Sequence, residues 1–294
     1  MILVSYRTRG TNEKWLPGIA HDGQVVRVPT SSVRELLEQG QKALNDAFEQ
    51  AREQFGAGQN LLPESAIEFG PPVPDPDKII CLGVNYREHA AEAQQQLPVA
   101  PMFFAKFRNS LIGPSDAVIL PRVSSQIDYE GELCAVIGKR CKEVSETEAL
   151  EYVAGYTLMN DISARDVQLQ TSQWMAGKAL DTFAPMGPGI VPASMLRDPQ
   201  NLTLTTRVNG QVVQQDNTGQ MIFSVAQAVS FLSQLMTLEP GDIIATGTPS
   251  GVGFKRTPPL FLKDGDVTEV EIEGIGIIRN PVKQNQAKES VGSL

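Results

Sequence analysis

Three carboxylates occupy every second position in residues 127–133, IDYEGEL. Successive side chains of an extended strand point to opposite faces, so Asp128, Glu130 and Glu132 share one face. Like charges about 4 Å apart repel by roughly 4 kcal/mol at an effective dielectric constant near 20. Such a cluster must protonate, spread into solvent or hold a cation, and a divalent cation is the natural partner of carboxylate oxygens. The alternative is an edge strand whose acidic face is solvated and discourages strand pairing.

A histidine and a glutamate follow a predicted buried strand in the segment KIICLGVNYREHAAEAQQQLP. Strong helix formers continue from Arg87 until Pro98, and Asn85 can cap this helix. His89 and Glu92 are three positions apart, so they share one helix face and can hydrogen-bond. A carboxylate that fixes an imidazole makes the histidine a positioned general base near neutral pH. The alternative is an ordinary surface pair; we favour a functional pair because the chain has only two histidines.

Other side chains capable of chemistry lie at the end of a predicted strand and in loops. Asp161 ends the run GYTLMND before a turn into a helix. This position suits a metal ligand from a second segment, although an aspartate at such a position, taken by itself, is more often a helix-capping residue. Lys178 lies in a loop interrupted by Gly and Pro, where its role depends on nearby acids. Lys255 and Arg256 could meet a second substrate carboxylate, but we expect both to be solvated.

The charge balance excludes some partners. The chain has 294 residues, with 34 acids against 25 bases and a net charge of −9. Nucleic acids and anionic membranes attract basic patches, so we expect neither as a partner. A small anionic substrate would need its own local cations, from a metal ion or from specific Arg and Lys residues.

Cysteine and histidine usage narrows the class further. Cys81, Cys134 and Cys141 form no CxxC pair and no even disulfide framework, which fits a reducing cytosol. The two histidines, His21 and His89, are too few for a three-histidine zinc site. The N-terminal apolar run is too short for a signal peptide, and no stretch approaches 18 apolar residues. We therefore expect a cytoplasmic protein without a membrane span.

The predicted elements divide the chain into a small first domain and a larger body. Residues 1 to about 30 alternate between short apolar runs and turns, and a single amphipathic helix is predicted from about residue 30 to 55. The proline-rich stretch GPPVPDPD cannot be helix or central strand, so it sets the boundary. We predict domains at 1–76 and 77–283, followed by a flexible tail at 284–294.

Strands outnumber helices in the predicted body. Asn209-Gly210 joins two β-rich runs and predicts a hairpin with a type I′ turn. An amphipathic helix is predicted over residues 224–237. Capping boxes predict helices that begin at Ser145 and Ser163. The pattern indicates an α+β protein dominated by sheet.

Five segments, taken together, resemble one family: LGVNYREHAAE, IDYEGELCAVIG, GYTLMNDISARDVQ, KALDTFAPMGP and GDIIATGTPSGVG. They occur in the order found in the fumarylacetoacetate hydrolase superfamily, over roughly residues 78–282. The first domain resembles the one carried by the longer bacterial members. The resemblance implies a mixed β-sandwich roll of the fumarylacetoacetase C-terminal-domain type, and a homodimer.

The resemblance also implies roles for individual residues. Glu130, Glu132 and Asp161 would bind Mg²⁺ or Mn²⁺, with Asp128 as a supporting group behind them. His89 and Glu92 would form a dyad on a lid that activates water. Lys178 would face the metal-bound oxygens. Three further residues would contact the substrate, a small anionic 2-oxo acid: Arg165, Gln168 and Thr248.

The substrate class follows from the same family. We expect first a hydrolase that cleaves the C–C bond of a 2,4-dioxo acid, such as an acylpyruvate, a fumarylpyruvate or a diketo-deoxy acid, to pyruvate and a carboxylic acid. The same enolate arises when oxaloacetate loses CO2 or when a proton moves between carbons. An oxaloacetate decarboxylase or tautomerase and a 2-hydroxyhepta-2,4-diene-1,7-dioate-type isomerase are therefore alternatives. A non-catalytic binding module is a more distant one.

Overall fold

Strands build most of the fold in the computed structural model, which describes residues 1–196 and 198–285. The largest sheet has twelve strands in the order β4-β3-β2-β1-β14-β12-β11-β17-β6-β7, with β5 paired to β1 and β8 paired to β14. These strands are β1 (Ile2–Thr8), β2 (Leu16–His21), β3 (Gln24–Arg27), β4 (Leu61–Pro63), β5 (Ile67–Phe69), β6 (Ile79–Gly83), β7 (Met102–Lys106), β8 (Leu111–Ile112), β11 (Gly131–Ile137), β12 (Val153–Asn160), β14 (Ala184–Pro192) and β17 (Ile243–Ala245).

A second sheet has five strands in the order β16-β15-β18-β19-β9. They are β9 (Val118–Leu120), β15 (Thr203–Val208), β16 (Gln211–Asn217), β18 (Val267–Ile272) and β19 (Gly276–Gln284). The two-stranded pair β10 (Ile127–Asp128) and β13 (Ser163–Ala164) is separate. One core cluster joins Leu133 and Leu158 of the large sheet to Leu204 and Val270 of the second sheet. The predicted α+β fold with packed mixed sheets is thus confirmed.

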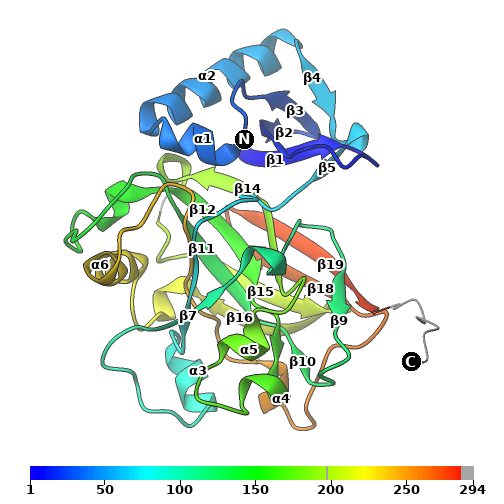
Figure 1. Ribbon diagram of the computed structural model, residues 1–294, viewed down its shortest axis with the longest axis vertical. Coiled ribbons are helices and arrows are strands. Elements are labelled where there is room, and N and C mark those ends of the chain that lie inside the picture. The colour runs from blue at the N-terminus through cyan, green and yellow to red at the C-terminus, as the bar shows by residue number, and fades with distance from the viewer. Residues whose placement is uncertain (197, 286–294) are drawn as a thin grey trace, which may run out of the picture.

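In the part of the chain that the structure describes, six α-helices lie around these sheets: α1 (Val33–Glu38), α2 (Gln41–Ala57), α3 (Arg87–Glu92), α4 (Arg165–Gln168), α5 (Met175–Lys178) and α6 (Val225–Leu235). The short helices α3, α4 and α5 lie at the opposite end of the molecule from α1 and α2 (Figure 1). No helix in the described ranges is both long and apolar enough to cross a bilayer.

The N-terminal elements share a sheet and a core with the body. Strand β1 pairs with β14 at Leu3 and Ile190, and Leu44 of α2 belongs to the same apolar cluster as Val136 of β11. A shared sheet and core do not test where a domain boundary lies, so the predicted division between residues 76 and 77 stays a prediction. The predicted tail lies outside the described residues from position 286 onward.

The single helix expected over residues 30–55 is wrong, because the chain forms α1 and α2 with a break between them. Ser32 caps α1 by accepting a hydrogen bond from the Glu35 N–H. Gly40 has φ +87°, a backbone conformation that side-chain-bearing residues rarely adopt, and α2 begins after it. Apolar spacing continues across the break, which is why periodicity alone missed it.

Strand 127–133 was also expected to be continuous, and it is interrupted. Asp128 ends β10, which pairs with β13, whereas Gly131 begins β11 in the large sheet. The Asp128 carboxylate accepts hydrogen bonds from the backbone N–H groups of Tyr129 and Gly253. These bonds turn the chain between the two strands, so Asp128 is separated from the other two acids.

Several local predictions have clear outcomes. The Asn209-Gly210 hairpin is confirmed, since both residues have positive φ between β15 and β16. Helix α6 is confirmed, with a capping box at Ser224. The prediction of an α-helix that begins at Ser145 is wrong, because the link between β11 and β12 forms a 3₁₀ helix at Ala149–Tyr152 instead.

Two predicted helix caps are wrong because their side chains have other partners. Ser163 lies in β13, and its hydroxyl donates to the Asp161 carbonyl. Asn85 does not cap α3; its amide donates to the carbonyls of Phe223 and Thr246 and so ties two distant segments together.

Candidate active site

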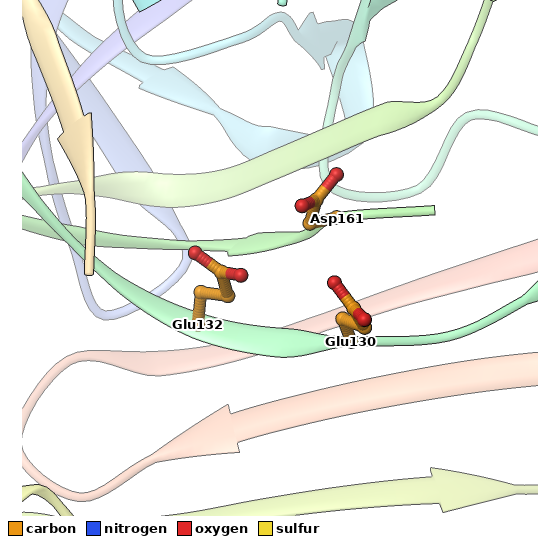
Figure 2. Close-up of side chains that lie close together, drawn as sticks. All are labelled: Glu130, Glu132 and Asp161. Atoms are coloured by element: carbon orange, nitrogen blue, oxygen red, sulfur yellow. The ribbon is translucent and has the colours of Figure 1, made fainter. Parts of the chain in front are cut away.

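Three carboxylates meet where β11 and β12 run side by side. Glu132 lies in β11, Glu130 directly precedes this strand, and Asp161 directly follows β12 (Figure 2). The strands are antiparallel, with Gly131 opposite Asn160, so Asp161 is placed across from Glu130. The Asp161 N–H donates to the Glu130 carbonyl at 2.7 Å. The three side chains are buried, and a carboxylate oxygen of each lies within 4.8 Å of the others.

Two lysines bind this acidic cluster. The Lys178 ammonium donates to Glu130 Oε2 at 2.5 Å and to Asp161 Oδ2 at 2.7 Å. Lys106 donates to Asp161 Oδ1 and, at 3.0 Å, to the carbonyl of Ile162. Burial opposes the charge of Lys178, but Asp161 and Glu130 outweigh it and raise the pKa of Lys178 above its usual value. Lys178 is therefore a cation held beside the cluster.

Arg165 connects Asp128 to Glu130. Its Nε donates to Asp128 Oδ2 at 2.8 Å, and its Nη2 donates to Glu130 Oε1 at 2.5 Å. Burial raises the pKa of Glu130, but Arg165 and Lys178 outweigh it and hold this pKa well below its usual range. Asp128 thus lies behind the cluster, where it orients Arg165.

Glu132 is the acid with the fewest protein partners. Its Oε2 accepts a hydrogen bond from the Gly247 N–H at 2.9 Å. Within the described ranges, no Lys, Arg or His nitrogen lies within 4.0 Å of it. Burial, together with the charges of Asp161 and Glu130, raises the pKa of Glu132 well above its usual range. A buried carboxylate that needs a cation fits a metal ligand.

The formal charges of the site support the same fit. It holds four buried carboxylates and three buried cations, which are Asp128, Glu130, Glu132, Asp161, Lys106, Arg165 and Lys178. With all seven of these groups ionised, their charges sum to minus one, so this cluster holds more negative than positive charge. A divalent cation would compensate that excess. The residues present therefore fit a divalent metal ion.

The predicted dyad lies on α3 beside the cluster. His89 Nδ1 is 3.2 Å from Glu92 Oε2, and His89 is 8 % exposed. The other carboxylate oxygen, Oε1, accepts a hydrogen bond from the Gly251 N–H at 3.0 Å. Glu92 therefore joins the histidine to the loop after β17. A carboxylate beside Nδ1 favours the tautomer with its proton on Nδ1, in which Nε2 can accept a proton.

A cavity of about 110 Å³ brings these groups together. His89, Glu130 and Glu132 line it, as do Lys178 and the other predicted substrate contacts, Arg165, Gln168 and Thr248. Its apolar wall is formed by Leu82, Val84, Phe104, Leu169, Trp174 and Phe254. A small number of polar groups together with apolar and aromatic side chains is typical of the lining of a small-molecule site.

The predicted substrate contacts are partly engaged with the protein itself. Arg165 Nη1 donates to Gln168 Oε1 at 3.0 Å. The Thr248 hydroxyl donates to the Gly131 carbonyl and accepts from Gln214 Nε2, both at 2.9 Å. The Thr248 hydroxyl proton is thus already used, so this side chain would have to rotate in order to donate to a carboxylate.

Sequence reasoning missed Lys106 and Gln214 as residues of the site, and it missed the hydrogen bonds of Arg256. Lys106 carried one signal, a lysine inside the apolar run MFFAKF. Gln214 carried none, because its partners lie far away in the sequence, at Gly131 of β11 and at Thr248 and Pro249 in the loop after β17. Arg256 was expected to be solvated, and this is wrong: its Nε donates to the Tyr129 hydroxyl at 3.0 Å, and it is only partly exposed. Lys255 is exposed, as expected.

Comparison with known proteins identifies the family. Residues 78–283 match the family model described as fumarylacetoacetate (FAA) hydrolase C-terminal. The chain is 45 % identical over 249 residues to the oxaloacetate tautomerase Fahd2a, mitochondrial, of Rattus norvegicus, covering 84 % of this chain and 78 % of the relative.

Two solved structures share the fold. The 5-carboxymethyl-2-hydroxymuconate delta-isomerase of Mycobacterium smegmatis has a TM-score of 0.77 and 33 % identity, covering 98 % of this chain and 100 % of its own. The maleylpyruvate hydrolase of Sphingobium sp. SYK-6, solved with manganese(II) ion and pyruvate, has a TM-score of 0.79 and 30 % identity, covering 97 % and 100 %. This chain therefore belongs to the fumarylacetoacetate hydrolase family.

Proposed function

We propose that this protein is a divalent-metal-dependent oxaloacetate tautomerase, which interconverts the keto and enol forms of its substrate. The observation that carries the proposal is one base, His89, in the same small cavity as a buried acidic cluster with its own lysine. The similarity to an oxaloacetate tautomerase over most of both chains supports the choice of reaction. Tautomerisation of oxaloacetate therefore replaces hydrolysis of a C–C bond as our leading hypothesis.

Tautomerisation moves one proton from carbon to oxygen and needs no water nucleophile. His89 Nε2 would take the proton from C3 of oxaloacetate, and the electron pair of the broken C–H bond would form the C2–C3 double bond. The carbonyl π pair would move to O2, which would take up a proton from water to give the enol. The protonated His89 would return its proton to water, which restores the neutral base. Glu92 would hold the imidazole by accepting from Nδ1–H.

A bound cation would complete the site. Glu130, Glu132 and Asp161 would hold Mg²⁺ or Mn²⁺, and the maleylpyruvate hydrolase solved with manganese supports this choice. When bound, a divalent ion supplies a Lewis acid that makes a neighbouring carbonyl more electrophilic. Lys178 would place a second positive charge near the developing oxyanion at O2.

The remaining cavity residues would orient the substrate. Arg165 and Gln168 line the cavity as a hydrogen-bonded pair held by Asp128. Their positions suit a substrate carboxylate, and Thr248 lines the cavity on the side of the loop after β17. The cavity volume, about 110 Å³, favours a substrate as small as oxaloacetate.

The test follows the decay of enol oxaloacetate by ultraviolet absorbance, after subtraction of the spontaneous rate. Mg²⁺, Mn²⁺ and EDTA are compared in parallel. We expect acceleration with either metal and the spontaneous rate with EDTA. An absence of acceleration with both metals would refute the proposal.

A second candidate is hydrolysis of a C–C bond in a short 2,4-dioxo acid, favoured by the maleylpyruvate hydrolase fold neighbour. Here His89 would deprotonate water rather than a carbon. Release of pyruvate and CO2 from acylpyruvates, maleylpyruvate, fumarylpyruvate, diketo-deoxy acids and oxaloacetate separates the reactions. Pyruvate without CO2 indicates hydrolysis, and pyruvate with equal CO2 from oxaloacetate indicates decarboxylation.

A homodimer and a cytoplasmic location remain proposals from the sequence. Light scattering coupled to gel filtration would test the first, and cell fractionation would test the second.

A further inference from the structure

The loop after β17 is fixed at Gly251 from two sides. On one side the Gly251 N–H donates to Glu92 Oε1 at 3.0 Å. On the other side the Gly251 carbonyl accepts from the Tyr129 hydroxyl at 3.1 Å and from Arg256 Nε at 3.2 Å. Both peptide groups that flank the Gly251 Cα are therefore held, one by the dyad and one by Tyr129 and Arg256.

Only glycine fits at position 251 in this arrangement. Its φ is +100°, and a Cβ at this position would lie 2.2 Å from the Val213 carbonyl oxygen. Arg256 Nη2 donates to the same Val213 carbonyl. The guanidinium thus joins β16 to the loop at the point of closest approach.

The role of Arg256 is not explained by an ion pair. Among the residues that the structure describes, no carboxylate oxygen lies within 4.0 Å of its nitrogens, although it is partly buried. Its Nε–H is shared between the Tyr129 hydroxyl at 3.0 Å and the Gly251 carbonyl. A planar guanidinium can hold several acceptors in fixed directions, which a lysine cannot do.

We propose that Arg256 and Tyr129 are positioning residues for the general base, acting through Gly251 and Glu92 on the imidazole of His89. The inference rests on the proposed function for its kinetic consequence, but the geometry it concerns can be measured without turnover. Tyr129 lies between the strand that ends at Asp128 and the metal-binding acid Glu130. The same stretch of chain thereby positions both the acids and the base.

The direct test is the tautomer of His89 in protein labelled with ¹⁵N-histidine. The chain has only two histidines, so His21→Gln assigns the spectrum. At mildly alkaline pH we expect a single Nδ1–H tautomer for His89 in the wild type, and a mixture of tautomers in Arg256→Met and in Tyr129→Phe. Arg256→Lys should restore the Nδ1–H tautomer in part. Tyr129→Phe keeps the ring in its pocket and provides a second variant if Arg256→Met folds poorly.

The kinetic test uses the same variants in the tautomerase assay. We expect kcat to fall by between about tenfold and a hundredfold, with KM and Mn²⁺ affinity within about twofold of the wild type. Arg34→Met is the matched control, since Arg34 is a partly buried arginine in α1 that binds Asp77 far from the cavity. It should change neither the His89 tautomer nor kcat.

Two results would overturn the proposal. One is a wild-type tautomer spectrum in both Arg256→Met and Tyr129→Phe. The other is a fall in kcat that is accompanied by a higher KM, a lower metal affinity and a lower thermal stability. That result would indicate a general structural role. If the protein has no tautomerase activity, the spectra still decide the positioning role.

Discussion

Lys178 Nζ lies 2.7 Å from Asp161 Oδ2, and both side chains are buried. The same ammonium contacts Glu130, so one lysine separates two of the three acids proposed to bind metal. Removal of this charge would leave two buried carboxylates facing each other.

Lys178→Met should therefore destabilise the metal-free protein. Loss of one partner of a buried ion pair costs about 3–5 kcal/mol in the free energy of unfolding. Saturating Mn²⁺ should recover part of this loss because the dication replaces the missing positive charge. Urea denaturation with Mn²⁺ or EDTA measures both effects. As the control, Lys42→Met removes an exposed ion pair with Asp46 and should cost less than about 1 kcal/mol. Equal losses in the two variants would contradict the prediction.

Glu132→Gln should abolish stabilisation by metal without lowering the stability of the metal-free protein. The amide has the same shape and removes a buried carboxylate that has no cationic partner within 4.0 Å in the described ranges. In the wild type, metal at 100 times its dissociation constant should add about 2.7 kcal/mol. Thermal unfolding with Mn²⁺ and with EDTA gives the comparison. The exposed acid Glu146 provides the control variant Glu146→Gln, which should respond to metal as the wild type does. A full metal response in Glu132→Gln would show that Glu132 is not a ligand.

The three cysteines should be inert in the folded protein. Burial raises the pKa of the Cys141 thiol to about 11, and burial also raises the pKa of the Cys81 and Cys134 thiols well above the usual value. The thiolate is the reactive form, so a thiol reagent at neutral pH should label the native protein only slowly. Three equivalents should react in denaturant. Fast labelling of the native protein would contradict this prediction, and Cys141→Ser would show whether that thiol is responsible.

Side-chain alternation predicted part of the site directly. Glu130 and Glu132 are two positions apart, so an extended segment places them on one face wherever the strand lies. The contact between His89 and Glu92 follows in the same way from helix geometry. These relationships are local, and local spacing is what one sequence contains.

The rest of the site depends on strand register, which a single sequence does not contain. Asp161 meets Glu130 because β11 and β12 pair with Gly131 opposite Asn160. Lys106 reaches Asp161 from a strand 55 positions earlier in the chain. The family resemblance supplied Asp161 as a ligand, and the apolar run around Lys106 gave no indication that its partner would be Asp161.

Errors in the predicted fold came from stretches where tertiary contacts overrode local patterns. Leu37 and Leu44 are seven positions apart, which fits one helix face, yet Gly40 breaks the helix so that α1 and α2 can both pack on the core. Asp128 follows the strand alternation in sequence, but its carboxylate binds Arg165 and the Gly253 N–H. Periodicity cannot anticipate such partners.

His89→Ala should remove the catalysed proton transfer and leave metal binding intact. A positioned general base contributes about 10²–10⁴ to the rate, so kcat for tautomerisation should fall by that factor. Glu92→Gln should reduce kcat by less, because the imidazole remains but loses a charged partner 3.2 Å away. The enol decay assay and Mn²⁺ titration measure the two properties separately. His21→Ala is the matched control, since this exposed histidine lies at the end of β2 and should leave both properties unchanged. If His89→Ala kept wild-type turnover, the base would have to be another cavity residue. If it lost Mn²⁺ binding as well, the histidine would support the metal site and not the proton transfer.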